Sequence, residues 1–207
     1  MKNYLTNKPV VYLMTWALTF VCLSCTAPKP AQIAFTSEWK KVFENAIAGD
    51  IEETTVSVIT DGIKFKIEDK YSINVYDGIN FYSKTKEIPM QDLFSSFSDN
   101  RDFLETQERE ISETQAKQYM FWLRSQGKKE GPGGNIAGQE TVLYQIGARR
   151  PDGELRSQTW VDAETGIVLK SMQTIYSTQI EQLVSKEETE CTQIEYGYVD
   201  EENFNKP

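Results

Sequence analysis

Residues 54–84 read TTVSVITDGIKFKIEDKYSINVYDGINFYSK, and this stretch decides the fold. Apolar residues alternate with polar ones along its runs, which is the period of a half-buried strand. Asp61-Gly62 and Asp77-Gly78 separate the runs, and Asp-Gly between alternating apolar residues is a strong hairpin signal. The stretch therefore predicts a meander of about four antiparallel strands with one apolar face.

Strands are also expected in the last third of the chain. Pro151-Asp152-Gly153 predicts a turn, because proline and glycine supply the backbone angles that a tight turn needs. The expected strands are Ile136–Ala148, Glu154–Asp162, Ile167–Ile175, Thr178–Ser185 and Glu190–Tyr198. Neither meander has a partner for its apolar face on its own, so we expect the two to form one continuous sheet.

Helical signals lie before and between the two meanders. Apolar residues recur at helical spacing over Ser37–Ala48, and Gly49 is a plausible stop. Ser112-Glu113-Thr114-Gln115 fits a capping box and predicts a helix over 113–126. A short helix is expected at 91–97. Residues 99–110 are either a second short helix or a polar lid, and residues 131–134 are expected to form a glycine-rich loop.

The order of these elements determines the fold class. Strands and helices are segregated along the chain, which is typical of an α+β protein with an antiparallel sheet. We expect a strongly curved antiparallel sheet whose concave, apolar face is covered by the helices of residues 90–126. One domain over residues 37–207 accommodates all of these elements.

The start of the chain has the layout of an export signal. Residues 1–24 contain Lys2 and Lys8 and no acidic residue. Within them, an apolar run from Val10 to Val21 follows the two lysines. The run then leads to Ser24-Cys25, which resembles the lipobox of bacterial lipoproteins. That resemblance implies removal of residues 1–24, a lipid such as palmitate on Cys25, and a tether over residues 25–36.

Two other interpretations of the leader stay open. An uncleaved membrane anchor is one, although Val10–Cys25 is shorter than the roughly 20 residues that cross a bilayer comfortably. Ordinary cleavage after Ala27 is the other, although Pro28 would then be the first mature residue. Lipidation also accounts for the cysteines, since Cys191 is left without a partner and is expected to be an ordinary strand residue.

Composition excludes several classes of function. The chain has no histidine, which removes the commonest general base and the commonest transition-metal ligand. The net charge of -9 would repel nucleic acid. No catalytic set stands out, and a histidine-free hydrolase is the weakest alternative. We therefore expect no enzyme activity, no cofactor and no metal.

Four stretches in the last third of the chain follow one another in a familiar order: Ile136–Thr141, Tyr144–Ile146, Trp160–Lys170 and Val199–Pro207. Together they resemble the outer-membrane lipoprotein-sorting family, which includes the Lol carriers. The resemblance implies an incomplete β-barrel whose concave face receives acyl chains or another apolar segment. It also implies an acidic, lipid-anchored protein of the bacterial cell envelope that faces the periplasm, at the outer membrane rather than the inner.

Candidate binding residues follow from the alternation and the expected helix. The ligand wall is expected to contain Phe65, Ile67, Tyr71, Ile73, Met120 and Leu123, with Ile63 and Val75 in the same alternating set. Each aromatic residue could equally belong to the core. Arg149-Arg150 could bind an anionic headgroup or be a solvated hairpin tip, and the acidic residues after Ser185 are expected to form a solvated strand face.

Two functions are compatible with these features. The first is a non-enzymatic, lipid-anchored protein that holds an acyl chain, a lipoprotein or an apolar peptide in a curved-sheet groove. The second is a regulatory or assembly protein that uses the same fold to bind another envelope protein, with the groove filled by its own side chains. The volume left between the sheet and its cover distinguishes them.

Overall fold

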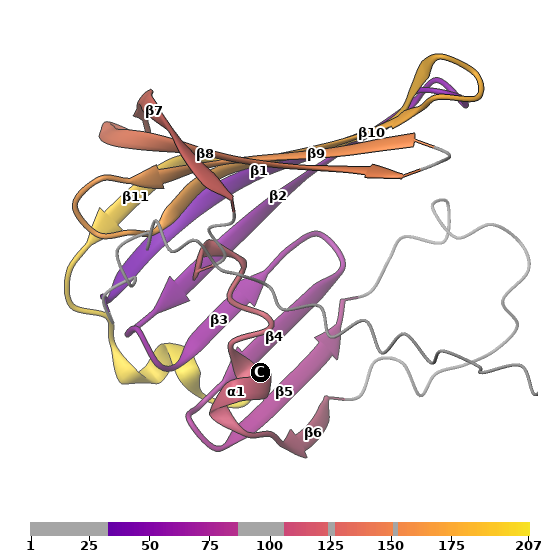
Figure 1. Cartoon of the computed structure of the whole chain (residues 1–207). Helices are drawn as coiled ribbons and strands as arrows, with labels where there is room; N and C mark the ends of the chain where they lie inside the picture. Colours follow the sequence, from indigo (N-terminus) through magenta and orange to yellow (C-terminus); the bar gives the residue numbers. More distant parts are fainter. Residues whose placement is uncertain (1–32, 87–105, 124–126, 151–152) are drawn as a thin grey trace, which may run out of the picture.

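A computed structural model describes residues 33–86, 106–123, 127–150 and 153–207 (Figure 1). They form one antiparallel sheet of 11 strands in the order β6-β5-β4-β3-β2-β1-β11-β10-β9-β8-β7. The strands are β1 (Phe35–Asn45), β2 (Asp50–Thr60), β3 (Phe65–Glu68), β4 (Ser72–Tyr76), β5 (Asn80–Thr85), β6 (Gln107–Glu110), β7 (Lys128–Ile136), β8 (Gln139–Arg150), β9 (Gly153–Asp162), β10 (Val168–Ser177) and β11 (Gln182–Tyr196). The helical segments are α1 (Glu113–Ala116) and the 3-10 turns η2 (Phe121–Leu123) and η3 (Glu201–Phe204).

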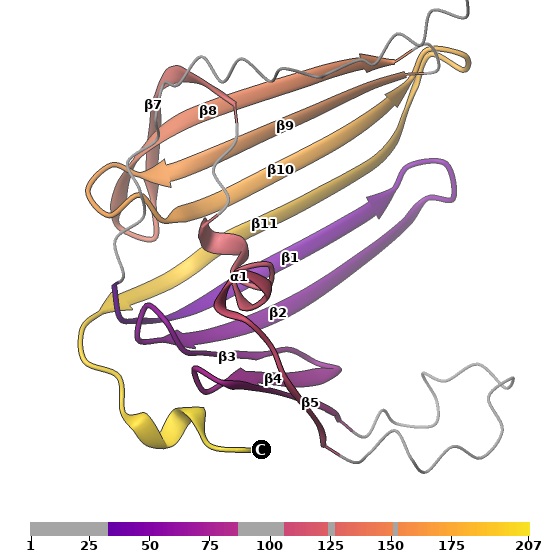
Figure 2. The same cartoon turned by 60° about the horizontal axis from the view of Figure 1, so that its bottom comes forward.

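The sheet joins the two expected meanders, as the sequence predicts. β1 pairs with β11 from Phe35 opposite Tyr196 to Asn45 opposite Ser185, and this pairing links the two halves. The sheet is strongly curved, and β6 and β7 are its two edges, so the described strands do not close into a barrel (Figures 1 and 2). The prediction of one continuous antiparallel sheet is confirmed.

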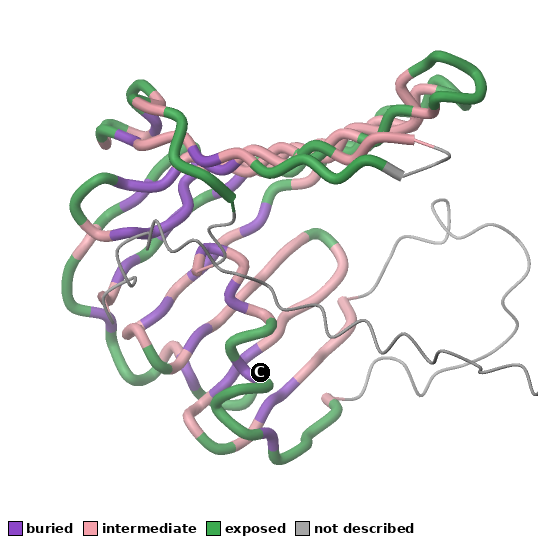
Figure 3. The backbone as a smooth tube through the Cα atoms, in the orientation of Figure 1, coloured by how far each residue is buried: buried purple, intermediate pink, exposed green. Residues whose placement is uncertain are grey.

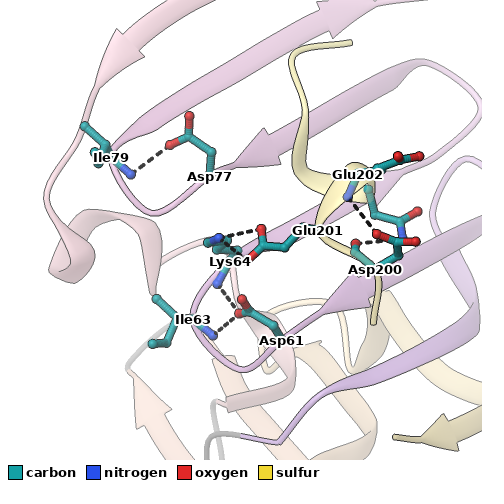
Figure 4. A network of polar contacts seen from close by, with 9 residues as sticks. Asp61, Ile63, Lys64, Asp77, Ile79, Asp200, Glu201 and Glu202 are labelled. Atoms are coloured by element: carbon teal, nitrogen blue, oxygen red, sulfur yellow. Dashed lines mark hydrogen bonds and ion pairs between the residues drawn. The ribbon is translucent and has the colours of Figure 1, made fainter. Parts of the chain in front are cut away.

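Both Asp-Gly turns form where the sequence predicts them. Asp61 Oδ1 accepts hydrogen bonds from the backbone N–H groups of Ile63 and Lys64, at 2.8 and 2.7 Å. Asp77 Oδ1 accepts the equivalent pair, from Ile79 at 2.8 Å (Figure 4) and from Asn80 at 2.7 Å. The aspartates close each turn locally, which explains why the dipeptide alone identifies these hairpins.

The helix expected over Ser37–Ala48 is wrong, because residues Phe35–Asn45 form strand β1. Phe35, Ser37 and Trp39 alternate as buried residues, and the Trp39 indole donates to Ser37 Oγ at 2.7 Å. β1 lies in the middle of the sheet and pairs along its whole length with β2 and β11. These strand pairings stabilise the extended conformation, although the apolar residues of the segment recur at helical spacing. β1 also begins two residues before the boundary expected for the folded domain.

The loop expected at residues 131–134 is also wrong, because these residues belong to strand β7. β7 is an edge strand with register shifts beside Gly131 and Gly134. Proline is tolerated on an edge strand, where its missing N–H costs no ladder hydrogen bond. A Cβ on Gly133 would lie 2.7 Å from the Trp160 ring, so glycine is required where β7 approaches this side chain.

The described part of the region between the meanders, residues 106–123, contains less helix than expected. Its capping box is present, with Ser112 Oγ accepting from the Gln115 N–H, but α1 ends at Ala116 instead of residue 126. Met120 and Trp122 are both buried. Residues two apart lie about 200° apart around an α-helix, so burial of both against one sheet requires a non-helical chain. Residues 107–110 form strand β6, and the helix expected at 91–97 lies outside the described residues.

A segment from Ile111 to Leu123 packs on the concave face of the sheet (Figure 2). Trp122 contacts the rings of Phe35 and Phe65 edge-on, with centroids 5.8 and 6.2 Å apart. Ala116 and Met120 belong to the same buried cluster. The concave face is therefore covered in part by one helical turn and a 3-10 turn, and not by the set of helices that the sequence predicts.

The opposite face of β2–β5 is covered by the end of the described chain. Val199 and Phe204 pack against Val75 and Tyr82. Lys64 Nζ lies 2.6 Å from a carboxylate oxygen of Glu201, and this contact raises the pKa of Lys64 (Figure 4). Each face of this half of the sheet thus buries its own apolar set, which explains why β4 and β5 carry consecutive buried residues.

Candidate functional site

Two hollows lie at the end of the sheet formed by the β1–β2 and β10–β11 turns, which we call the distal end. The larger hollow has a volume of about 510 Å³ and is lined by Leu155, Ile175, Tyr176 and Val184, together with polar residues. The second measures about 310 Å³ and is lined by Phe43, Val56, Tyr71 and the stems of charged residues. Both combine an apolar floor with a polar rim, which is the usual character of a small-molecule site.

The strand register places both hollows on the concave face. Gln173 lies directly opposite Glu187, which lies directly opposite Phe43. Directly opposed residues of an antiparallel sheet point to the same side. Phe43 and the core residue Trp39 also share a side, because they lie four positions apart on one strand. The hollows therefore continue the concave face beyond its covering segment.

Exposed apolar side chains gather at the distal end. Asn45 pairs with Ser185, and the Ala46 N–H donates to the Val184 carbonyl at 3.0 Å, so the two hairpins lie side by side there. Figure 3 shows largely exposed chain at both tips. The exposed large apolar residues of this end are Phe43, Ile47, Ile51, Ile175, Tyr176 and Ile180. Apolar exposure concentrated in one place marks a binding surface more often than scattered exposure does.

Four of the predicted wall residues belong to the filled core. Phe65 and Met120 are 0% and 2% exposed. Ile67 and Leu123 pack against the same cluster. The covering segment packs against these four side chains, in the space in which the sequence predicts a ligand.

The other predicted wall residues are separated by the strand register. Ile73 packs with Val75, Val199 and Phe204 on the opposite face, while Ile63 is exposed at a turn. Glu68 pairs with Ile73, so odd-numbered residues of β3 share a face with even-numbered residues of β4. A shift of one residue exchanges the faces of a strand. The expectation that Phe65 and Ile73 share one wall is therefore wrong.

Tyr71 is the one predicted wall residue that reaches an open hollow. It follows Asp69, whose Oδ1 accepts the backbone N–H groups of Tyr71 and Ser72 at 2.8 and 2.7 Å. The Tyr71 hydroxyl donates to Glu52 across the second hollow at 3.3 Å. Lys41 and Glu187 form an ion pair of 2.9 Å on the same rim. This rim is polar and carries three acidic residues against one lysine, and it surrounds the apolar surface of Phe43 and Val56.

The acidic residues of β11 are compensated by lysines. Lys170 Nζ lies 2.6 Å from Glu188 and 2.5 Å from Glu190. Hydrogen bonds from Lys170 and Lys186 lower the pKa of Glu188. Within the described ranges, no three metal-ligating side chains gather into a metal site. In the same ranges, no helix is long and apolar enough to span a membrane.

Comparisons with known proteins find a likeness among solved structures alone. No protein-family model and no curated protein sequence matches the chain. The chain is similar to solved structures of a LolA superfamily protein, of an outer membrane lipoprotein-sorting protein domain and of a DUF1329 family protein. One is a LolA superfamily protein of Nitrosomonas europaea, with a TM-score of 0.36 and 9% identity over 85% of this chain and 91% of that chain.

Two further solved structures show a similar likeness. A domain from Vibrio parahaemolyticus assigned to outer membrane lipoprotein sorting has a TM-score of 0.29 and 10% identity, over 84% of this chain and 90% of that chain. A DUF1329 family protein of Desulfovibrio piger has a TM-score of 0.30 and 11% identity, over 83% and 89%. At these TM-scores the likeness carries no argument about function.

Sequence reasoning misses the residues of the distal end. The helical spacing places Phe43 in a helix, and the strand patterns give Ile175 and Val184 no role, while Tyr176 is only one of many aromatic residues that could line a cavity. A signal is nevertheless present, because the turn Asn45–Gly49 and the segment 175–180 contain no charged residue. An uncharged, aliphatic hairpin tip in an acidic protein is the feature that could have identified this end.

The thiol of Cys191 is predicted to be unreactive in the native protein. Burial raises the pKa of Cys191 to about 12, and the neighbouring Glu190 adds to the effect. The thiolate is the reactive form, so iodoacetamide at pH 8 should leave this residue unmodified until denaturant is added. Peptide mass spectrometry would measure the modified fraction. Rapid labelling of Cys191 without denaturant would contradict the buried position.

Proposed function

We propose that this chain is a lipid-anchored protein of the bacterial cell envelope that binds an apolar ligand, an acyl chain, at the distal end of its concave face. The protein acts by binding and catalyses no reaction. One observation carries the proposal: the concave face continues beyond its covering segment into two hollows, of about 510 and 310 Å³, that are bordered by exposed aliphatic and aromatic side chains.

The expected energetics favour this assignment. Each buried methylene of a ligand contributes roughly 0.8 kcal/mol before ordering costs are subtracted. The larger hollow falls within the range of about 300–1,000 Å³ that is typical of ligand sites. A chain of about ten carbons could therefore bind usefully through apolar contact with Leu155, Ile175 and Val184 alone.

Anchoring at Cys25 is the second part of the proposal. It is supported by the basic and apolar leader that ends at Ser24-Cys25. Cys25 lies outside the described residues, which begin at residue 33 beside the start of β1. The β1–β2 turn lies at the other end of β1. Because β1 has 11 residues, this turn is about 35 Å from the start of the strand. The described chain therefore begins at the end of β1 that lies opposite the distal end, and we place the protein at the outer membrane, facing the periplasm.

A second candidate function is supported by the filled core. Phe65 and Met120 show that the space beneath the covering segment is taken by the protein's own side chains. A groove filled in this way is what a protein-binding role would leave. In that case the exposed apolar residues of the distal end contact another envelope protein, and no acyl chain is bound.

The proposal predicts that Ile175→Glu weakens binding of a fluorescent fatty acid at least tenfold. The substitution places a charge on the floor of the larger hollow, where a bound chain would leave it unpaired. Ile63→Glu is the matched control, because Ile63 and Ile175 are both 43% exposed but lie at opposite ends of the sheet. Titration followed by fluorescence gives the affinities, and circular dichroism verifies folding.

The titration separates the two candidate functions. Strong binding by the wild type and by Ile63→Glu, with weak binding by Ile175→Glu, supports an acyl ligand at the distal end. Absence of binding by the folded wild type would reject the acyl ligand and favour the protein partner. Equal binding by all three proteins would place the ligand elsewhere.

A further inference from the structure

A third hollow, of about 280 Å³, lies on the concave face beside the edge strand β6. It is lined by Asn74, Phe81, Ser83, Arg109 and Tyr119, together with Gln107 and Glu108. Arg109 lies directly opposite Phe81 in the strand register, so both side chains project to the same side. This hollow combines a cation with neutral hydrogen-bonding groups above an aromatic floor, and its one acidic lining residue, Glu108, directs its side chain to the other face of the sheet.

Arg109 is held in place by aromatic contacts and not by a carboxylate. Its guanidinium lies 5.0 Å from the centroid of the Phe81 ring, and Phe81 stacks on Tyr119 at 4.5 Å. The guanidinium also donates a hydrogen bond to the Tyr119 hydroxyl oxygen. The ion pairs formed among the described residues do not include Arg109. This is unusual in a chain with 31 acidic and 22 basic residues.

The acidic neighbours of Arg109 are directed to the other face of the sheet. Glu108 and Glu110 alternate with Arg109 along β6 and lie opposite Tyr82 and Asn80. Glu108 is already paired there with Lys206, at 2.8 Å. The strand alternation thus leaves the positive charge of Arg109 on the concave face and compensates the negative charge of Glu108 on the opposite face.

Two donors converge in this hollow. A guanidinium has five N–H donors, and the bond to Tyr119 uses only part of them. In that bond the Tyr119 oxygen is the acceptor, so its own proton is available to another group. Ser83 donates to Asn74 at 2.9 Å, which fixes a polar wall beside them. Arginine with an adjacent hydroxyl is well suited to the two oxygens of a carboxylate or to a phosphate.

From this geometry we infer that Arg109 and Tyr119 form an anion subsite that binds the headgroup of an amphiphile, a carboxylate or a phosphate. The aromatic floor of Phe81 and Tyr119 belongs to the buried core cluster, so an apolar body attached to the headgroup meets apolar surface. The hollow has room for a headgroup and not for a long chain. The inference rests on the proposed function in that both bind an amphiphile on the concave face, but several strands separate this subsite from the larger hollow, so each site holds its own ligand.

The subsite is tested with three probes that share a ten-carbon chain: decanoate, decyl phosphate and uncharged decanol. Isothermal titration calorimetry on the full chain gives each affinity. Wild type should bind the anionic probes at least tenfold more tightly than decanol. Arg109→Gln should remove that preference and leave decanol binding unchanged, and Tyr119→Phe should weaken anion binding about threefold. Arg156→Gln is the matched control, because Arg156 is an exposed arginine already bonded to Glu154.

Each outcome bears on the inference. Tighter binding of decanoate points to a free fatty acid, and tighter binding of decyl phosphate points to a phospholipid headgroup. Decanol binding with no preference for the anions, in wild type and Arg109→Gln alike, would overturn the subsite and leave the proposed function standing. Absence of binding by all three probes would contradict both. Equal loss in Arg156→Gln would show a general charge effect and would also overturn the subsite.

Discussion

Trp122→Ala is expected to lower the free energy of unfolding by about 3–5 kcal/mol, which is typical of a buried tryptophan replaced by alanine. Trp122 is 2% exposed and contacts Phe35, Phe65 and Phe121 edge-on. Its contacts with Phe35 and Phe65 join the covering segment to β1 and β3. Truncation would therefore leave a cavity beneath that segment. Urea unfolding followed by circular dichroism measures the difference.

The matched control for this prediction is Tyr198→Ala. Tyr198 is also an aromatic residue, but it is 89% exposed. Its truncation should change stability by no more than about 0.5 kcal/mol, as is usual for surface substitutions. Similar losses in the two variants would show that the segment from Ile111 to Leu123 does not pack on the concave face as described.

Cys25→Ser is expected to remove nearly all of the protein from the membrane fraction, or to leave an unprocessed precursor that retains residues 1–24. The proposed lipid is attached to the Cys25 thiol, and serine offers no thiol for that reaction. Fractionation with detergent partitioning, together with the mass of the mature chain, measures the effect. The loss should be complete where the lipid is the sole anchor.

Cys22→Leu provides the control for this experiment. It also removes a cysteine of the leader, but leucine is the residue that the lipobox pattern prefers three positions before the modified cysteine. This variant should remain processed and membrane-bound. A Cys25→Ser protein that is still cleaved and still partitions with detergent would contradict lipidation and support cleavage after Ala27 or an uncleaved anchor.

Locally determined elements could be predicted from the sequence. The turn at Asp61-Gly62 forms through hydrogen bonds within three residues of the aspartate, so the dipeptide carries the information. β1 could not be identified in this way. One of its partners is β11, where Thr192 donates to the Glu38 carbonyl across a separation of 154 residues. The spacing of apolar residues within one short segment carries no information on a strand partner so far away in the sequence.

The candidate site is less predictable than the fold, for two physical reasons. The face on which Ile73 lies depends on a register that the turn at Asp69 sets, and a difference of one residue moves it to the other side of the sheet. The space in front of Phe65 is filled by Met120 and Trp122, which the expected helix could not have buried together. Apolar alternation therefore identifies the buried surface but not the part of it that stays open.

The most direct test of the central claim is whether the native protein carries an acyl ligand at the distal end. Native mass spectrometry of the full chain, purified from cells and then mixed with palmitate, detects non-covalent adducts by mass. We expect one acyl adduct on the wild type and on Ile63→Glu, and a strongly reduced adduct on Ile175→Glu. A folded wild type that carries no adduct and takes up no palmitate would contradict the claim.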